Sequence, residues 1–298
     1  MNLYLVSVPY RYDEPNQGLG AGPIALIDAG LEKAAAVQGI CLRATLTAHL
    51  DPADKEEGRT AVNIGTLGAS TAKLVRQALA DGCPALVLTG DDTAAVGVIS
   101  GVQMANGADA RIGVVWLDAH GDFNTPETSY SGILAGMSLS IIAGLSGPNW
   151  RRAARMAAPV PTSRIVLAGV RELDEKEEAL IRATDVKIIP AAGLTSGEEF
   201  AQALRRLADD CDVLVLHLDI DLLDPHLVPS TTTPSENGLD LDAAARVLRA
   251  VLATGKVAVW TICNVNPGGG GRGERSIAST IELISASIGS WTTARTGE

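Results

Sequence analysis

The sequence is short of aromatic residues, positive charge and histidine, and each shortage excludes a class of function. Aromatic residues make up 3% of the 298, which argues against recognition by base stacking or by an aromatic cage. Lys and Arg number 24 against 35 Asp and Glu, so the formal net charge is −11. A nucleic-acid partner is not expected, because phosphate neutralisation needs a basic face. With four histidines in the chain, a metal site must depend mainly on carboxylates.

Long apolar runs are also missing. No stretch of 18 consecutive apolar residues occurs, and Arg11 and Asp13 interrupt the N-terminal segment before a signal peptide could form. We therefore expect a cytoplasmic protein with no membrane partner. No two of the four cysteines form a CxxC pair, so we interpret all four as buried, reduced thiols.

The pattern of apolar residues predicts an α/β fold. Short β-branched runs alternate with stretches of helical period, as in βαβ units on a parallel sheet. Several runs are apolar throughout, which is typical of strands covered on both faces. No segment has the composition of a linker, and we expect one domain over residues 1–298. Eight runs are predicted to be strands: residues 3–8, 40–46, 84–89, 111–117, 164–168, 186–189, 213–219 and 257–263.

Two acidic segments follow predicted strands. The first reads Asp-Ala-His-Gly-Asp at residues 118–122, and the second reads Asp-Ile-Asp at residues 219–221. Carboxylates packed this closely repel one another unless a cation neutralises them, so both segments predict metal ligands. Residues two apart on a strand point the same way, and strand C-termini face the ligand crevice of an α/β protein. The alternative is that these acids cap helices and form turns, which we prefer for Asp224 alone.

A third acidic loop follows the strand predicted at residues 84–89. Its Asp91 and Asp92 either cap the next helix, where the dipole favours negative charge, or bring one carboxylate into the cluster. His217 precedes Asp219 in the second segment. We interpret it as a packed core histidine that faces the opposite side of its strand.

These segments resemble the signatures of the arginase (ureohydrolase) superfamily, which includes agmatinases and formiminoglutamases. Residues 118–126 are similar to its Asp-Ala-His-x-Asp motif, and residues 219–225 to its Asp-x-Asp-x-x-Asp-Pro motif. The resemblance covers essentially the whole chain and points to a divergent arginase-like branch. It implies a three-layer α/β/α sandwich on an open, mostly parallel eight-stranded sheet, assembled as a homotrimer or homohexamer. An open sheet also fits the chain itself, because ligands from the fourth and seventh runs meet where strand order reverses.

The resemblance implies a site with two Mn²⁺ ions, bridged by a hydroxide that attacks a guanidino carbon. By that resemblance, Asp118 and Asp219 bridge the ions, while His120 and Asp221 complete one site and Asp122 serves the other. Hard oxygen ligands favour Mn²⁺ here. The predicted metal ligands are Asp92, Asp118, His120, Asp122, Asp219 and Asp221.

Three departures from the family pattern fall at the reacting end of the site. Asp92 stands where the family has a metal-binding histidine, Ala135 where it has a proton-shuttling histidine, and Asn264 where it has a glutamate that pairs with guanidinium. An added carboxylate weakens the metals as Lewis acids. One interpretation is a non-catalytic homologue with a structural or ligand-binding role. The other is an enzyme whose substrate differs from arginine at this end. A carboxylate-rich Ca²⁺ or Mg²⁺ binding protein is a third option, which His120 disfavours.

The end of the site that holds the amino-acid part of the substrate keeps the family's residues. At the reacting end, a neutral Asn264 suits a guanidino amino acid less basic than arginine, and N-hydroxy-L-arginine is our first choice. We predict a Mn-dependent amidinohydrolase that releases ornithine and a urea-type product, with Asp122 and Asn264 as catalytic residues. The substrate-binding set is Asn124, Ser129, Ser131 and Asp174 at the amino-acid end and Thr233 at the guanidino end. Ordinary loop hydrogen bonding is the alternative for the first four.

Overall fold

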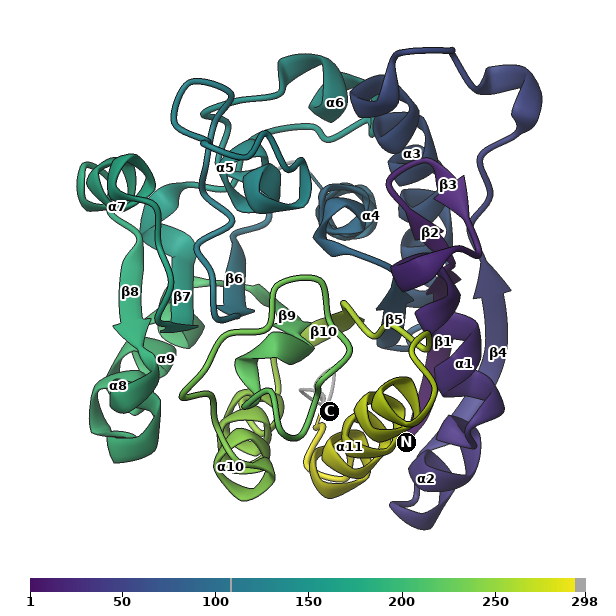
Figure 1. Cartoon of the computed structure of the whole chain (residues 1–298), viewed down its shortest axis with the longest axis vertical. Helices are drawn as coiled ribbons and strands as arrows, with labels where there is room; N and C mark the ends of the chain where they lie inside the picture. The colour runs from purple at the N-terminus through teal and green to yellow at the C-terminus, as the bar shows by residue number, and fades with distance from the viewer. Residues whose placement is uncertain (108, 293–298) are drawn as a thin grey trace.

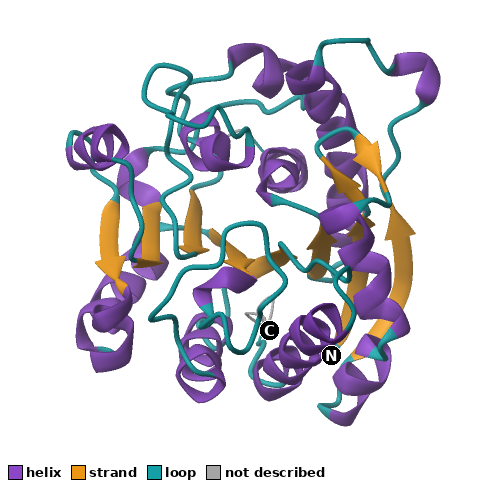
Figure 2. Cartoon of the chain, in the orientation of Figure 1, coloured by secondary structure: helices purple, strands orange, loops and turns teal. Residues whose placement is uncertain are grey.

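The eight predicted runs form one parallel sheet. The computed structural model describes residues 1–107 and 109–292, with the strands in the order β4-β1-β5-β10-β9-β6-β7-β8 (Figures 1 and 2). A separate antiparallel hairpin, β2 and β3, was not predicted because two-residue strands carry no period. The strands are β1 Asn2–Val8, β2 Tyr10–Arg11, β3 Glu14–Pro15, β4 Cys41–Thr47, β5 Ala85–Thr89, β6 Ile112–Leu117, β7 Ile165–Val170, β8 Lys187–Pro190, β9 Val213–Asp219 and β10 Val257–Cys263.

Helices cover both faces of the sheet and make it the middle of three layers (Figure 1). Side chains of the central strands alternate between two hydrophobic cores: on β5, Leu86 and Leu88 join one core and Val87 joins the other. This alternation is why the central strand sequences are mainly apolar. One layer consists of α3 Thr60–Ala80, α4 Ala95–Asn106, α5 Ser138–Ile142, α6 Pro148–Ala153 and α7 Glu175–Arg182. The other consists of α1 Gly22–Asp28, α2 Leu31–Val37, α8 Ala191–Ser196, α9 Glu198–Asp210, α10 Leu241–Leu252 and α11 Gly271–Ile288.

Four strands that precede functional segments are neighbours at the centre of the sheet. They lie in the order β5-β10-β9-β6, although β5 and β6 follow one another in the sequence. All are parallel, so their carboxyl ends meet at one edge. The expectation that the fourth and seventh runs meet is confirmed, since β6 pairs with β9. The open sheet, not a barrel, is the architecture.

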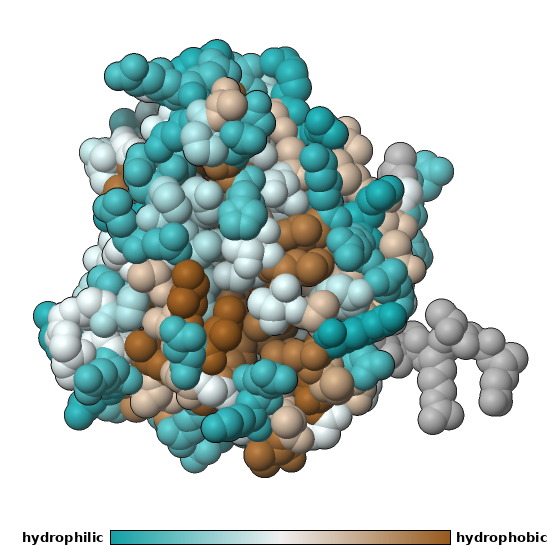
Figure 3. All heavy atoms as spheres, turned by 90° about the vertical axis from the view of Figure 1, so that its right-hand side faces the viewer, coloured by the Kyte–Doolittle hydropathy of each residue, from teal (hydrophilic) through white to brown (hydrophobic). Residues whose placement is uncertain are grey.

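The edge strand β4 differs from the central strands. Its residues alternate between exposed and half-buried, and Figure 3 shows this side of the molecule with apolar groups lying among polar ones. Cys41, at the start of β4, is exposed, so the expectation that all four cysteines are buried is wrong for this one. An edge strand lacks a neighbour on one side, which leaves its side chains partly in solvent. None of the described helices is long and apolar enough to cross a membrane.

Helices α3 and α4 cross at glycines. A Cβ added at Gly97 on α4 would lie 2.5 Å from the carbonyl oxygen of Gly68 on α3, closer than any carbon tolerates. The contact brings the two backbones together and fixes where α4 begins. The turn that contains Asp92 leads directly into α4. The same contact therefore fixes the position of the Asp92 carboxylate at the carboxyl edge of the sheet.

We expect Gly97→Ala to lower the free energy of unfolding by about 1–3 kcal/mol, because the added methyl group forces two packed helices apart. Urea unfolding followed by circular dichroism measures it. The control is Gly271→Ala, where the added Cβ has no atom within 4 Å. Equal stability of both variants would show that the crossing has room to adjust.

Candidate metal centre

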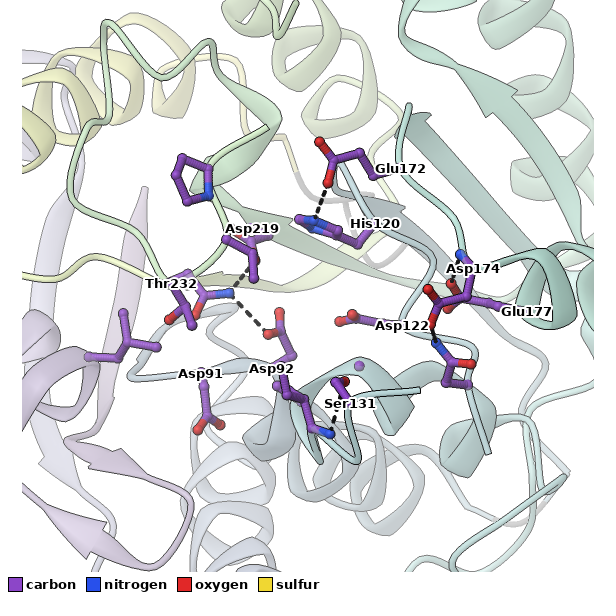
Figure 4. Close-up of a pocket in the computed structure, with 18 of the residues that line it drawn as sticks. Asp91, Asp92, His120, Asp122, Ser131, Glu172, Asp174, Glu177, Asp219 and Thr232 are labelled. Atoms are coloured by element: carbon purple, nitrogen blue, oxygen red, sulfur yellow. Dashed lines mark hydrogen bonds and ion pairs between the residues drawn. The ribbon is translucent and has the colours of Figure 1, made fainter. Parts of the chain in front are cut away.

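The predicted ligands converge at the carboxyl edge of the four central strands. Asp118 follows β6, Asp219 ends β9, and Asp92 lies in the turn after β5. Figure 4 shows Asp92, Asp122, His120 and Asp219 around one space, at the floor of a cavity of about 750 Å³. All five aspartates of the predicted set are buried, and His120 is half-buried.

His120 forms the core of the first group of ligands. Its Nδ1 lies 3.1 Å from Asp221 Oδ2 and 3.4 Å from Asp118 Oδ1. The ligand atoms of these three residues all lie within 4.8 Å of one another. Trp116 Nε1 donates to Asp118 Oδ2 at 3.0 Å and fixes the orientation of that carboxylate. Such a partner outside the ligand set is common at metal sites, where it holds a ligand in the coordinating geometry.

Asp122 belongs to a second group with Asp92 and Asp118, again with ligand atoms within 4.8 Å. Its backbone has φ +49°, in the left-handed region that aspartate tolerates better than most residues. Its Oδ2 is buried and accepts no hydrogen bond from any described residue. A buried carboxylate oxygen without a partner is costly, and a cation would satisfy it.

The electrostatics of the metal-free site favour a cation. Burial, and then the charge of Asp221, raises the pKa of Asp118 to about 8. Burial and the neighbouring carboxylates raise the pKa values of Asp122 and Asp219 well above the usual range. Burial alone would lower the pKa of His120, but hydrogen bonds to Asp118 and Asp221 outweigh it and raise the pKa to about 12. The protein therefore holds excess negative charge here that only bound cations or protons neutralise.

The structure separates the roles of the adjacent Asp91 and Asp92. Asp91 turns away from the shared space (Figure 4) and caps the following turn, where it accepts from Thr93 N at 3.0 Å and from Tyr12 N at 2.9 Å. Asp92 is the residue that joins the cluster. Both alternatives left open by the sequence are therefore realised, one by each residue.

The sequence correctly predicts that His217 is buried, but the prediction that it faces the side of its strand opposite to Asp219 is wrong. Residues 217 and 219 are two apart, so strand alternation places both on the same face of β9. The His217 Nε2 atom lies 3.0 Å from Asp92 Oδ1, and its ring stacks on Trp116 with centroids 3.6 Å apart. Cys263, which sequence analysis did not assign to the site, places its Sγ 3.0 Å from the same Asp92 oxygen. Burial would raise the pKa of Asp92, but His217 outweighs it and lowers that pKa.

Asn264 follows β10 and links Asp92, after β5, to Asp219, at the end of β9, the two strands on either side of β10. Its side-chain amide donates to Asp92 Oδ2 at 3.0 Å and also to Asp219. Its φ of +65° lies in the left-handed region, as at Asp122. Thr233 and Ala135 line the same cavity. The two hydrogen bonds from the amide thus offset part of the repulsion between the carboxylates of Asp92 and Asp219.

The predicted amino-acid end lies farther along the cavity. Asp174 and Asn124 both line it, and Asn124 Nδ2 donates to Asp174 Oδ2 at 3.2 Å. Ser131 also lines the cavity. Ser129 lies outside the described lining, and its Oγ accepts from Gly132 N at 2.9 Å, so loop hydrogen bonding describes it better.

Several lining residues were not predicted from the sequence. Glu172 Oε2 lies 3.5 Å from His120 Nε2, across the site from Asp221. Glu177 is buried below the cavity, where its Oε1 accepts from Phe123 N at 2.8 Å, and it forms a capping box with Asp174 at the start of α7. The spacing Asp-x-x-Glu at the start of a helix could have indicated this role for Glu177. Arg11, from the β2–β3 hairpin, had no such signal.

Comparison with known proteins identifies the family. A model of the arginase family matches residues 1–288. The chain belongs to the arginase family. It is 30% identical to the arginase of Neurospora crassa over 89% of this chain and 78% of that one, and 31% identical to the arginase of Bacillus caldovelox over 79% and 81%. The structure of Entamoeba histolytica arginase in complex with L-ornithine superposes with a TM-score of 0.84, at 25% identity and with 97% of this chain and 98% of that one covered.

Arginase-family proteins generally bind a dinuclear metal site. The residues of this chain fit such a site on two observations: the two groups of ligand atoms share Asp118, and Asp122 Oδ2 is buried without a partner among the described residues. The resemblance expected from the two acidic motifs is thereby confirmed for both family and fold.

We expect Mn²⁺ to raise the melting temperature of the metal-stripped protein by about 5 °C at a hundredfold excess over Kd, because the ions neutralise buried carboxylates. Differential scanning calorimetry measures the shift. The double variant Asp118→Asn/Asp219→Asn should lose it, whereas Asp242→Asn, at an exposed position on α10, should keep it. An undiminished shift in the double variant would place the ions elsewhere.

Proposed function

We propose that the protein is a Mn-dependent amidinohydrolase whose substrate is N-hydroxy-L-arginine or a similarly weakly basic guanidino amino acid. Water adds to the guanidino carbon, the bond from that carbon to the side-chain nitrogen breaks, and ornithine leaves with a urea-type product, which is hydroxyurea for N-hydroxy-L-arginine. As a member of the arginase family, the protein is a hydrolase of amidino C–N bonds. The choice of metal and of substrate is our proposal.

The observation that carries the proposal is the contrast between the two ends of the cavity. At one end Asp174 offers a carboxylate to an amino group, and Asn124 and Ser131 offer polar groups to a carboxylate. At the other end the neutral amide of Asn264 lies between Asp92 and Asp219. A full guanidinium gains most from a carboxylate partner, so a neutral amide there favours a less basic group. N-hydroxylation lowers the basicity of guanidine.

Side chains of this protein bind, orient and exchange protons around the reacting carbon. When bound, two divalent cations, with Mn²⁺ among them, would supply an activated water and Lewis-acid polarisation, and Asp92, Asp118, His120, Asp122, Asp219 and Asp221 would hold them. The Asp122 carboxylate lines the cavity, so the oxygen that does not face a cation is placed to take a proton from the attacking water. Ala135 provides no proton donor at the cavity wall, which leaves Asp122 to return that proton to the departing amine.

The substrate assignment predicts a preference that ornithine release measures directly. With Mn²⁺ present, kcat/KM for N-hydroxy-L-arginine should exceed that for L-arginine at least about tenfold, which corresponds to about 1.4 kcal/mol. Agmatine, which lacks the α-carboxylate, should be a poor substrate. Faster turnover of L-arginine would contradict the role given to Asn264. No turnover of either amino acid by manganese-loaded protein would favour the non-catalytic homologue.

Asp174 is expected to bind the substrate amino group. Asp174→Asn should raise KM roughly 10- to 100-fold, the range for a lost hydrogen bond to a charged group, with a smaller change in kcat. Because asparagine caps helices as well as aspartate does, the melting temperature should stay the same. The matched control is Glu175→Gln, one residue further along α7 and exposed. A drop in melting temperature at unchanged KM would assign Asp174 to capping alone.

A further inference from the structure

Three chemically different ligand groups meet below the cavity floor. Asp92 Oδ1 lies 3.0 Å from His217 Nε2 and 3.0 Å from Cys263 Sγ, and the Sγ and Nε2 atoms are 3.5 Å apart. The three residues follow or lie on β5, β9 and β10, which are neighbours in the sheet. All three are buried, and His217 and Cys263 lie outside the cavity lining. His217 and Cys263 therefore do not face the cavity, whereas Asp92 borders it.

The spacing of the trio approaches that of a zinc site. With Zn–S near 2.3 Å and Zn–N and Zn–O near 2.1 Å, the edges of a coordination tetrahedron are about 3.4–3.6 Å. The three observed edges are within about half an ångström of these values. Binding an ion would require only a small outward movement of the side chains.

The imidazole of the trio is also held in place. The ring of His217 is stacked on Trp116 with an interplanar angle of 15°, and Trp116 in turn donates to Asp118 in the neighbouring ligand group. A ligand whose orientation is fixed by packing loses little freedom when it binds an ion. Cys263 sits on β10 between the other two strands, so the sheet itself fixes the position of its sulfur.

We propose that Asp92, His217 and Cys263 form a binding site for one thiophilic divalent cation, of which Zn²⁺ and Co²⁺ are examples. The nitrogen and sulfur donors select against Mn²⁺, which prefers oxygen. The neighbouring group of Asp118, His120 and Asp221 remains the site for an oxygen-preferring ion. The chain would thus bind two unlike metals, with the imidazole of one site supplied by β9. In making this ion one of the two metals of the hydrolase, the inference rests on the proposed function.

Cobalt tests the proposal because Co²⁺ bound to a thiolate has a charge-transfer band in the near ultraviolet. Metal-stripped, reduced full-length protein is titrated with CoCl₂ and followed by absorption. We expect the band to saturate at one Co²⁺ per chain, to be absent in Cys263→Ser and Cys263→Ala, and to require at least tenfold more Co²⁺ in His217→Gln. With Zn²⁺ and Mn²⁺ supplied together, elemental analysis should find about one of each per wild-type chain, and less zinc in Cys263→Ala.

Controls separate this result from adventitious binding and from the proposed function. Cys41→Ser, which removes the exposed thiol, should keep the band, and circular dichroism confirms that each variant is folded. A band that persists in both Cys263 variants, or Co²⁺ bound without a band, would overturn the proposal and leave Asp92, His217 and Cys263 as a hydrogen-bonded cluster. The readout needs no substrate, so loss of ornithine release with the band intact would refute only the proposed function.

Discussion

Five carboxylates buried at one edge of a parallel sheet impose the constraint on which the rest of the structure depends. Removing ionised carboxylates from water costs free energy, and their mutual repulsion adds to that cost. The raised pKa values of Asp118, Asp122 and Asp219 express both effects. The fold accepts this cost because the adjacent ends of β5, β10, β9 and β6 hold the acids where divalent cations can neutralise them. The close crossing of α3 and α4 serves the same end, since it positions the turn that contains Asp92.

Two of the three departures from the arginase pattern, Asp92 and Asn264, are joined by a hydrogen bond. Asp92 is contacted on one oxygen by His217 and Cys263 and on the other by Asn264. Each of these neighbours compensates the charge or directs the orientation of a carboxylate that replaces the family's imidazole. Asn264 also donates to Asp219, so hydrogen bonds from one amide join two of the predicted metal ligands. Isolated losses of function would not be expected to produce such a set of mutual contacts.

Much of the fold and of the ligand set could be predicted from the sequence, for local reasons. Apolar β-branched runs specify strands buried on both faces, and acids at the ends of two such runs specify a cation site. Prediction failed where the outcome depended on neighbours. Cys41 is exposed because its strand lies at the sheet edge, and Ser129 turns to a loop amide instead of the cavity. The error for His217 had another cause. Its spacing of two residues from Asp219 already predicts that both side chains lie on the same face of the strand.

The sequence by itself determined the parallel α/β architecture, the family and the inventory of acidic ligands, because these follow from short-range patterns of residue type. The tertiary structure alone decided which of these residues touch. It inserted β10 between β5 and β9, although 171 residues separate Cys263 from Asp92. Strand order arises from the packing of whole βαβ units, and no local pattern encodes it. The contacts of Asp92 with His217, Cys263 and Asn264 therefore became visible only in the folded chain.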